Sequence, residues 1–158
     1  MTKEEFEKLI DKDKYQVFVF TSPCSLPVNF IRHPWLVVNK KGIVSRWEVG
    51  HILGLPAQKS WGYLYKDFLP PWKGIRLFRY SSHFSNKSRL LSLIEGDENS
   101  EAKRMAELIE SSPNIYPYCY KYRLIGPNSN SYVSWMLKQF PELKIELPWN
   151  CLGKTVKE

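Results

Sequence analysis

The sequence predicts an α+β fold, with a mainly antiparallel sheet and helices packed on it. The expected elements follow the order helix, strand, hairpin, strands, helix, strand, helix. Two of the strands form an evident hairpin, and two amphipathic helices come late in the chain. This order favours antiparallel pairing, with helices covering a face of the sheet. A length of 158 residues fits one domain, which we expect to span residues 1–158 with a core at 14–154.

The first elements follow from capping and β-propensity. Thr2 and Glu5 have the spacing of a capping box and predict a short amphipathic helix over residues 3–11. Aromatic and β-branched residues then predict a strand at 15–20, which the two prolines of residues 21–27 end.

The clearest hairpin pairs residues 33–39 with residues 43–51, and Lys40–Gly42 supply the turn. Residues 52–74 are rich in proline, glycine and aromatic side chains, so we expect a long ordered loop there. A further strand is expected at 75–81.

The second half of the chain predicts two helices and at least one strand. Residues 90–95 fit a strand or a helix, and we favour a strand. The other expected elements are a helix at 101–112, capped by Ser100 and ended by Pro113, a strand at 118–125 and a helix at 129–140.

Composition limits the functional classes. The net charge of +7 favours anionic partners, namely nucleic acid, lipid head groups or acidic substrates, although the basic residues are scattered. No apolar stretch is long enough for a transmembrane segment, and the charged N-terminus is not a secretory signal, so we expect a cytoplasmic protein. The cysteines Cys24, Cys119 and Cys151 lack zinc-type spacing, and we expect no metal and no cofactor. The oligomeric state stays open.

Three residues of the hairpin form the first part of a candidate site. In an antiparallel hairpin with an even-length loop, His33, Arg46 and Glu48 lie on one face, because side chains alternate with period two. Depending on the turn, Glu48 is directly opposite His33 or diagonal to it. A carboxylate in either place fixes the imidazole tautomer and favours its protonated form.

The segment GPNSNSY at 126–132 forms the second part. Asn128 is a good N-cap, which places Ser129 at the first position of a helix. The free backbone N–H groups there can hold an oxyanion, and Asn128 and Asn130 add amide donors. Plain helix capping, a packed histidine and a surface ion pair are the structural alternatives for these residues.

Three stretches resemble a bacterial family of unknown function: HPWLVVNKKGIVSRWEV, YPYCYKYRLIGPNSNSYVSWMLKQFPEL and LPWNCLGK. The likeness extends from residue 32 to residue 154, and its most specific part is GPNSN. The chain has Ser131-Tyr132 where the family has Thr-Phe. That family carries no established activity.

The order of these residues also resembles, more distantly, circularly permuted papain-like enzymes of the NlpC-type and lecithin–retinol acyltransferase-like groups. That resemblance implies a permuted papain-like fold and a hydrolase or acyltransferase acting on an amide or ester bond. Ser129 would be the nucleophile in the place of a cysteine, His33 the base and Glu48 its orienting group. Asn128 and the helix N-terminal N–H groups would hold the oxyanion, with Asn130 as a further amide donor. Arg46 and the basic surface would favour an acidic or lipid-like substrate. The alternative function is a non-catalytic binding domain for an anionic ligand, a protein or nucleic acid.

Overall fold

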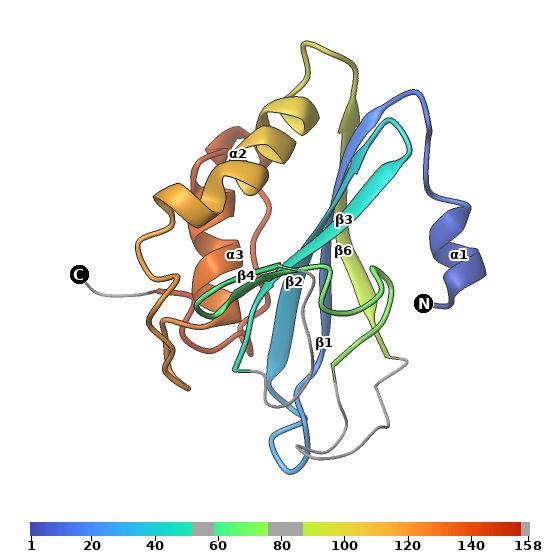
Figure 1. The fold of residues 1–158 in the computed structure, drawn as a ribbon. Helices are drawn as coiled ribbons and strands as arrows, with labels where there is room; N and C mark the ends of the chain where they lie inside the picture. The colour runs from blue at the N-terminus through green and yellow to red at the C-terminus, as the bar shows by residue number, and fades with distance from the viewer. Residues whose placement is uncertain (52–58, 76–86, 156–158) are drawn as a thin grey trace.

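The structure is a computed structural model that describes residues 1–51, 59–75 and 87–155. A twisted sheet stands between two layers (Figure 1). Helices α2 (Glu101–Ile115) and α3 (Ser129–Lys138) cover one face, and α1 (Lys3–Glu7) lies against the other. This arrangement confirms the α+β class.

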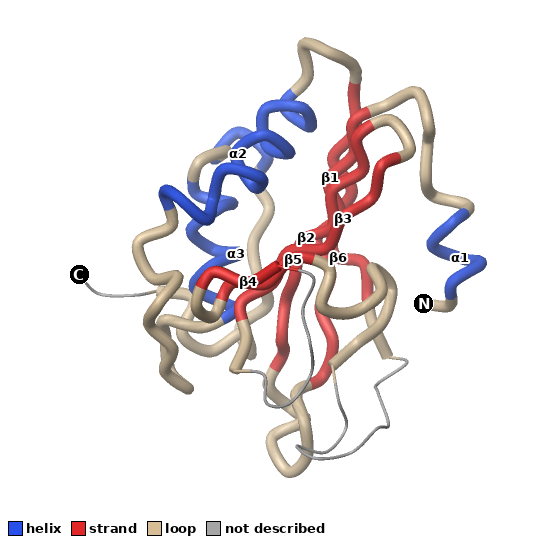
Figure 2. Tube along the Cα trace, in the orientation of Figure 1, coloured by secondary structure: helices blue, strands red, loops and turns tan. Residues whose placement is uncertain are grey.

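In the described part of the chain the sheet has six strands, all paired antiparallel, in the order β4-β5-β3-β2-β1-β6 (Figure 2). The mainly antiparallel sheet is therefore confirmed. The strands are β1 (Tyr15–Pro23), β2 (Arg32–Lys40), β3 (Ile43–Val49), β4 (Lys59–Trp61), β5 (Leu64–Lys66) and β6 (Arg89–Gly96).

Each face of the sheet carries its own apolar core, because alternate side chains of a strand point to opposite sides. Leu36 and Val38 pack with α2 and α3. Trp35 and Val37 belong to the core on the other face, which also contains Phe6 of α1. We name these the α3 face and the α1 face.

The capping box is present, but α1 ends at Glu7, earlier than predicted. Helix α2 continues through Pro113 to Ile115, so the prediction that Pro113 ends the helix was wrong. A proline cannot donate to the carbonyl four residues earlier. Here the Ser112 hydroxyl donates to that carbonyl, Ile109 O, at 2.7 Å, which keeps the carbonyl satisfied.

Residues 118–125 form turns and irregular chain, and the predicted strand was wrong. The alternating tyrosines pack as an irregular segment, with Tyr118 and Tyr122 against the α3-face core. Its backbone bonds are scattered: Tyr63 N donates to Cys119 O at 2.7 Å, and Arg123 N donates to Pro127 O at 2.8 Å.

The predicted loop at 52–74 contains the short β4–β5 hairpin, so it is less irregular than expected. Residues 52–58 lie outside the described residues, as does the predicted strand at 75–81 from residue 76 onward. The strand preferred at 90–95 is confirmed as β6. A 3-10 turn, Pro141–Leu143, follows α3. Among the described residues no helix has the length and apolarity to cross a bilayer.

Candidate functional site

The β2–β3 turn sets the register that gathers the predicted hairpin residues. Lys40 pairs with Ile43, which leaves Lys41-Gly42 as a two-residue turn, and both residues have positive φ, 50° and 91°. Such turns fit the twist of a hairpin and favour glycine. Arg46 pairs with Val37 and therefore lies on the α1 face. His33 and Glu48 share that face by alternation.

These three residues form a charged cluster. His33 Nε2 lies 3.0 Å from Glu48 Oε2. Arg46 Nη2 donates to the same oxygen at 2.9 Å, and Arg46 Nε lies 2.8 Å from Oε1. Arg46 and Glu48 are buried, while the His33 side chain retains 10% exposure. The three side chains lie on one face of the hairpin, as the sequence predicted.

The charges of the cluster compensate one another. Burial of the Glu48 carboxyl favours its neutral form, but the charge of Arg46 and the hydrogen bond from His33 outweigh burial and lower its pKa to about 2. Glu48 is therefore ionised at neutral pH and accepts hydrogen bonds only. A buried carboxylate without these partners would be costly.

The cluster also holds the chain that follows β5. Arg46 Nη1 donates to Pro70 O at 2.9 Å and to Lys73 O. The backbone N–H of Arg46 donates to Asp67 Oδ1 at 2.7 Å, and Trp35 Nε1 donates to Pro71 O at 2.9 Å. The Arg46 guanidinium carbon lies 4.2 Å from the Trp35 ring centroid, a cation–π contact. Arg46 therefore both binds Glu48, the partner of His33, and holds the segment that follows β5.

Ser129 is not beside His33. Helix α3 packs on the α3 face, and His33 projects from the α1 face, so the sheet lies between the helix and the imidazole. The expected nucleophile–base pair is therefore not assembled. Helical periodicity shows which side of α3 is apolar, but it does not show which face of the sheet that side covers.

The hydroxyl that register places opposite His33 belongs to Ser22, which the sequence analysis did not single out. Ser22 is fully buried. Its Oγ donates to Pro23 O at 3.2 Å and accepts from Ile75 N at 3.4 Å. The β1–β2 register could have revealed it, but the loop between these strands gives no turn signal that fixes that register.

Polar side chains at the start of α3 form hydrogen bonds with the backbone of the C-terminal segment. Asn128 caps the helix through its side-chain oxygen, as predicted, accepting from Asn130 N at 2.9 Å and Ser131 N at 3.3 Å. Its amide nitrogen donates to Leu124 O at 2.9 Å and to Leu152 O at 3.1 Å. We name the side chains of Asn128, Asn130 and Ser131 the C-terminal clasp.

Two further side chains complete the C-terminal clasp. Asn130 Nδ2 donates to Leu152 O at 2.6 Å, and the Ser131 hydroxyl donates to Gly153 O. Gly153 has φ of 80°, and a Cβ there would lie 2.4 Å from Gly126 N, so glycine is required. The amide groups of Asn128 and Asn130 are thus bound to backbone carbonyls, and the prediction that they serve as oxyanion donors finds no support in their contacts.

The cysteines are poor nucleophiles here. Burial raises the pKa of Cys24 and of Cys151 to about 11, and it also raises the pKa of Cys119. Thiolate is the reactive form, so these thiols are largely unreactive at neutral pH. Within the described ranges, His, Cys, Asp and Glu side chains do not gather in threes as a metal-ligand set.

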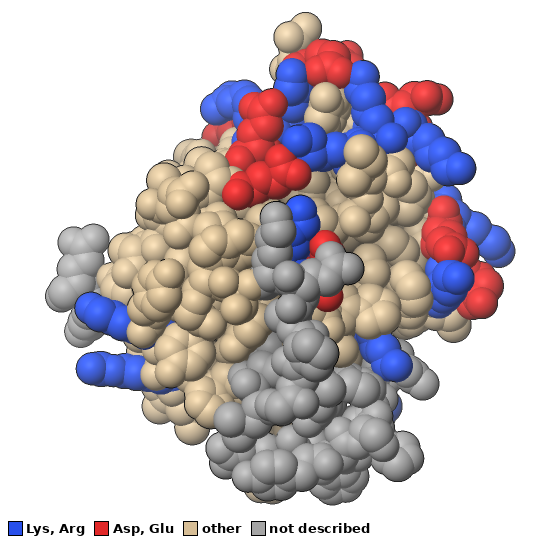
Figure 3. Space-filling view, in the orientation of Figure 1, with Lys and Arg blue, Asp and Glu red and all other residues tan. Residues whose placement is uncertain are grey.

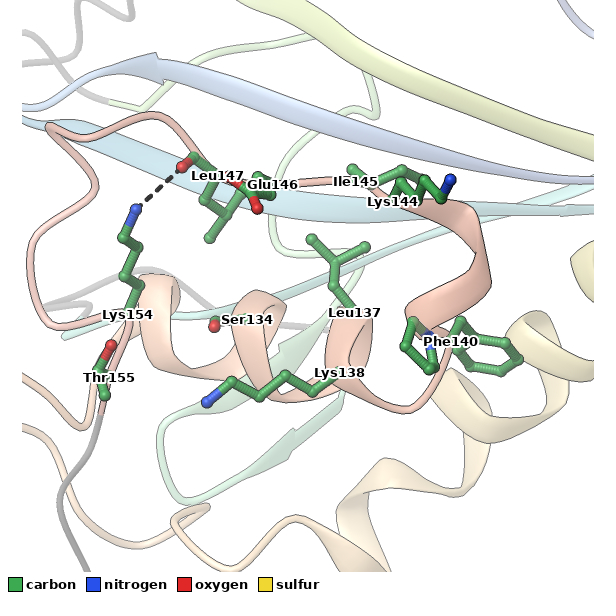
Figure 4. Close-up of a pocket in the computed structure, with 11 residues that line it drawn as sticks. Ser134, Leu137, Lys138, Phe140, Lys144, Ile145, Glu146, Leu147, Lys154 and Thr155 are labelled. Carbon is green, nitrogen blue, oxygen red and sulfur yellow. Dashed lines mark hydrogen bonds between the residues drawn. The ribbon is translucent and has the colours of Figure 1, made fainter.

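A groove of about 440 Å³ lies between α3 and residues 144–155 (Figure 4). Leu137, Phe140 and Leu147 supply apolar lining. Lys138, Lys144 and Lys154 add three cationic side chains to the lining, and Glu146 adds one anionic side chain. Lys154 Nζ donates to Leu147 O at 3.1 Å. The groove lies on the α3 face, away from His33.

Fold and site together define an α+β domain with a buried charged cluster on one face of its sheet and a capped, clasped helix on the other. Residues 14–156 match the family described as "Protein of unknown function (DUF3750)", and the chain belongs to that family. No curated protein matches the chain. No solved structure matches it either.

Proposed function

We propose that the chain is a hydrolase or acyltransferase acting on an amide or ester bond, with His33 as its acid–base group. The observation that carries the proposal is the 3.0 Å contact between His33 Nε2 and Glu48 Oε2. Because Glu48 is ionised, Nε2 donates to it. In the neutral imidazole Nδ1 then has the free lone pair. The lone pair of Nδ1 can then take a proton, and the His33 side chain retains 10% exposure.

The reaction follows from that tautomer. As the oxygen of a water or of an acceptor alcohol attacks the carbonyl carbon, its proton passes to His33 Nδ1. Glu48 stabilises the imidazolium that forms, because an opposite charge in contact favours the charged ring. The proton then passes to the leaving oxygen or nitrogen as the scissile bond breaks. Arg46 is a positioning residue that keeps Glu48 ionised and in place.

The proposal retains the chemistry implied by the permuted papain-like resemblance but gives the attacking role to water or to an acceptor molecule. Ser129 has no part in it, because α3 lies across the sheet from His33. A covalent acyl-serine would require the two residues to meet.

The test is turnover of p-nitrophenyl esters and peptide p-nitroanilides by purified protein. We expect His33→Ala to lower kcat/KM by about 10²–10⁴-fold, the usual contribution of general acid–base catalysis. His51→Ala, at an exposed histidine stacked on Tyr63, is the matched control and retains activity, as does Ser129→Ala. Full turnover by His33→Ala, loss of turnover in Ser129→Ala, or no turnover by the wild type would overturn the proposal.

The alternative function is binding of an anionic ligand without chemistry. The groove on the α3 face favours it, because three lysines and one glutamate line that groove. Its volume of about 440 Å³ is within the usual range of small-molecule sites. Saturable binding of dodecanoate in calorimetry, together with no cleavage of any ester or amide, would replace the hydrolase proposal with this one. Binding of an oligonucleotide but not of dodecanoate would instead favour a nucleic-acid-binding domain.

A further inference from the structure

Exposed apolar side chains gather on three loops of the described chain. Trp149 is 83% exposed, Ile125 75% and Phe30 63%. Monomeric proteins seldom leave so many large apolar groups together in water unless the surface has a partner. The full set on these loops is Leu26, Phe30, Tyr120, Leu124, Ile125, Trp149 and Leu152.

Hydrogen bonds from two asparagine side chains and one backbone N–H connect the three loops at one end of the molecule. Asn150 Nδ2 donates to Phe30 O at 2.7 Å, and Arg32 N donates to Asn150 O at 3.1 Å. The carbonyls of Leu124 and Leu152 bind the same nitrogen, Asn128 Nδ2. We name this region, with the side chains given above, the apolar end.

The charged residues on these three loops are basic. Residues 24–33, 111–128 and 147–155 contain no Asp or Glu and include Arg32, Lys121, Arg123 and Lys154, whereas Glu146 directly precedes the third range. Figure 3 shows one face of the molecule, on which the acidic side chains gather toward the top and right and the lower left carries only basic ones. The opposite end of the sheet has paired charges, with Lys41 at 2.5 Å and Lys103 at 2.9 Å from Glu98.

We propose that the apolar end docks on a membrane surface that contains anionic lipid. Tryptophan, tyrosine and leucine side chains on loop tips favour the headgroup region, where an apolar group is buried and a polar one stays wet. Lysine and arginine beside them are attracted by anionic headgroups. A lipid surface meets both the apolar and the basic requirements, because it offers hydrocarbon and anionic headgroups side by side.

The C-terminal clasp fits this role. Backbone carbonyls that approach a bilayer need hydrogen-bond donors, because hydrocarbon supplies none. Asn128 donates to the carbonyls of Leu124 and Leu152, and Asn130 donates to that of Leu152. The backbone carbonyls of these two exposed leucines therefore have hydrogen-bond donors. The motif that resembled a catalytic helix start thereby stabilises the loops of the docking surface.

The test is sedimentation of the full chain with vesicles of pure phosphatidylcholine and of phosphatidylcholine mixed with phosphatidylglycerol. We expect binding to the anionic vesicles, weaker binding in high salt, and at least a tenfold loss of partitioning in the double variant Ile125→Ser, Trp149→Ala. Ile43→Ser is the matched control, since Ile43 is 76% exposed at the opposite end of the sheet, and it binds like the wild type.

Circular dichroism melts of each variant exclude misfolding as the cause of lost binding. His33→Ala should bind vesicles normally, which separates this inference from the proposed chemistry. No partitioning by the wild type, or equal losses in the apolar-end variant and Ile43→Ser, would overturn the inference. A dimer in light scattering that the double variant disrupts, without vesicle binding, would identify a protein interface instead.

Discussion

The two polar clusters of this domain are built from different chemistry. The charged cluster of His33, Arg46 and Glu48 lies on strands and holds ionised groups out of water. The C-terminal clasp lies at a helix start and joins neutral amides and a hydroxyl to backbone carbonyls. Removing one buried charge leaves its partner unpaired in the interior. The C-terminal clasp is instead stabilised by several hydrogen bonds that contribute separately. The His33 side chain in the charged cluster retains 10% exposure. We therefore expect the two clusters to respond differently to substitution.

The largest effect is expected from Arg46→Met, which removes the cation and leaves Glu48 buried without it. Breaking a buried ion pair by removing one partner costs about 3–5 kcal/mol of unfolding free energy. Urea denaturation measures the loss. Adding Glu48→Gln to this variant should restore part of it, because no unpaired charge then remains.

The matched control is Lys41→Met, which removes one of the two lysine partners of the exposed Glu98. Exposed ion pairs contribute little, so its denaturation midpoint should stay near that of the wild type. Similar losses in Arg46→Met and Lys41→Met would show that the charged cluster is no more coupled than a surface pair.

The second largest effect is expected from acid pH, which should lower the contribution of the charged cluster to the free energy of unfolding. The Glu48 pKa is lowered from 4.5 to about 2, so its contribution to stability is present above pH 4.5 and is lost as pH falls toward 2. A shift of this size corresponds to roughly 3 kcal/mol of unfolding free energy. The difference in unfolding free energy between the wild type and Glu48→Gln, measured by urea denaturation at successive pH values, isolates this group from other carboxyls. That difference should shrink between pH 4.5 and 2, and a constant difference would contradict the assignment.

The sequence predicted the charged cluster because one short turn determines it. Given Lys41-Gly42 as the turn, the alternation along two strands places His33, Arg46 and Glu48 on one face. The Asn128 cap was also predictable, since a cap depends on neighbouring residues only. Local pattern therefore accounts for both clusters taken separately.

The relation between the clusters was not predictable in the same way. Both sides of the sheet carry apolar strand residues, so the pattern of β2 does not show which side α3 covers. The tyrosine alternation at 118–125 misled for a related reason, because packing of an irregular segment against a core produces the same spacing as a strand. Partners distant in sequence decide both points.

The smallest of these effects is expected at Asn128, and two substitutions there divide the C-terminal clasp into its parts. Asn128→Ala removes the helix cap and the donors to Leu124 O and Leu152 O, and we expect a loss of about 1–3 kcal/mol. Asn128→Asp keeps an oxygen acceptor for the helix N–H groups but removes the amide donors, and it places carboxylate oxygens against the two carbonyls. If the clasp contributes beyond the cap, both variants lose stability in urea denaturation. Wild-type stability in Asn128→Asp would mean that the cap alone matters, and that the carbonyls of the apolar end need no donor from this side chain.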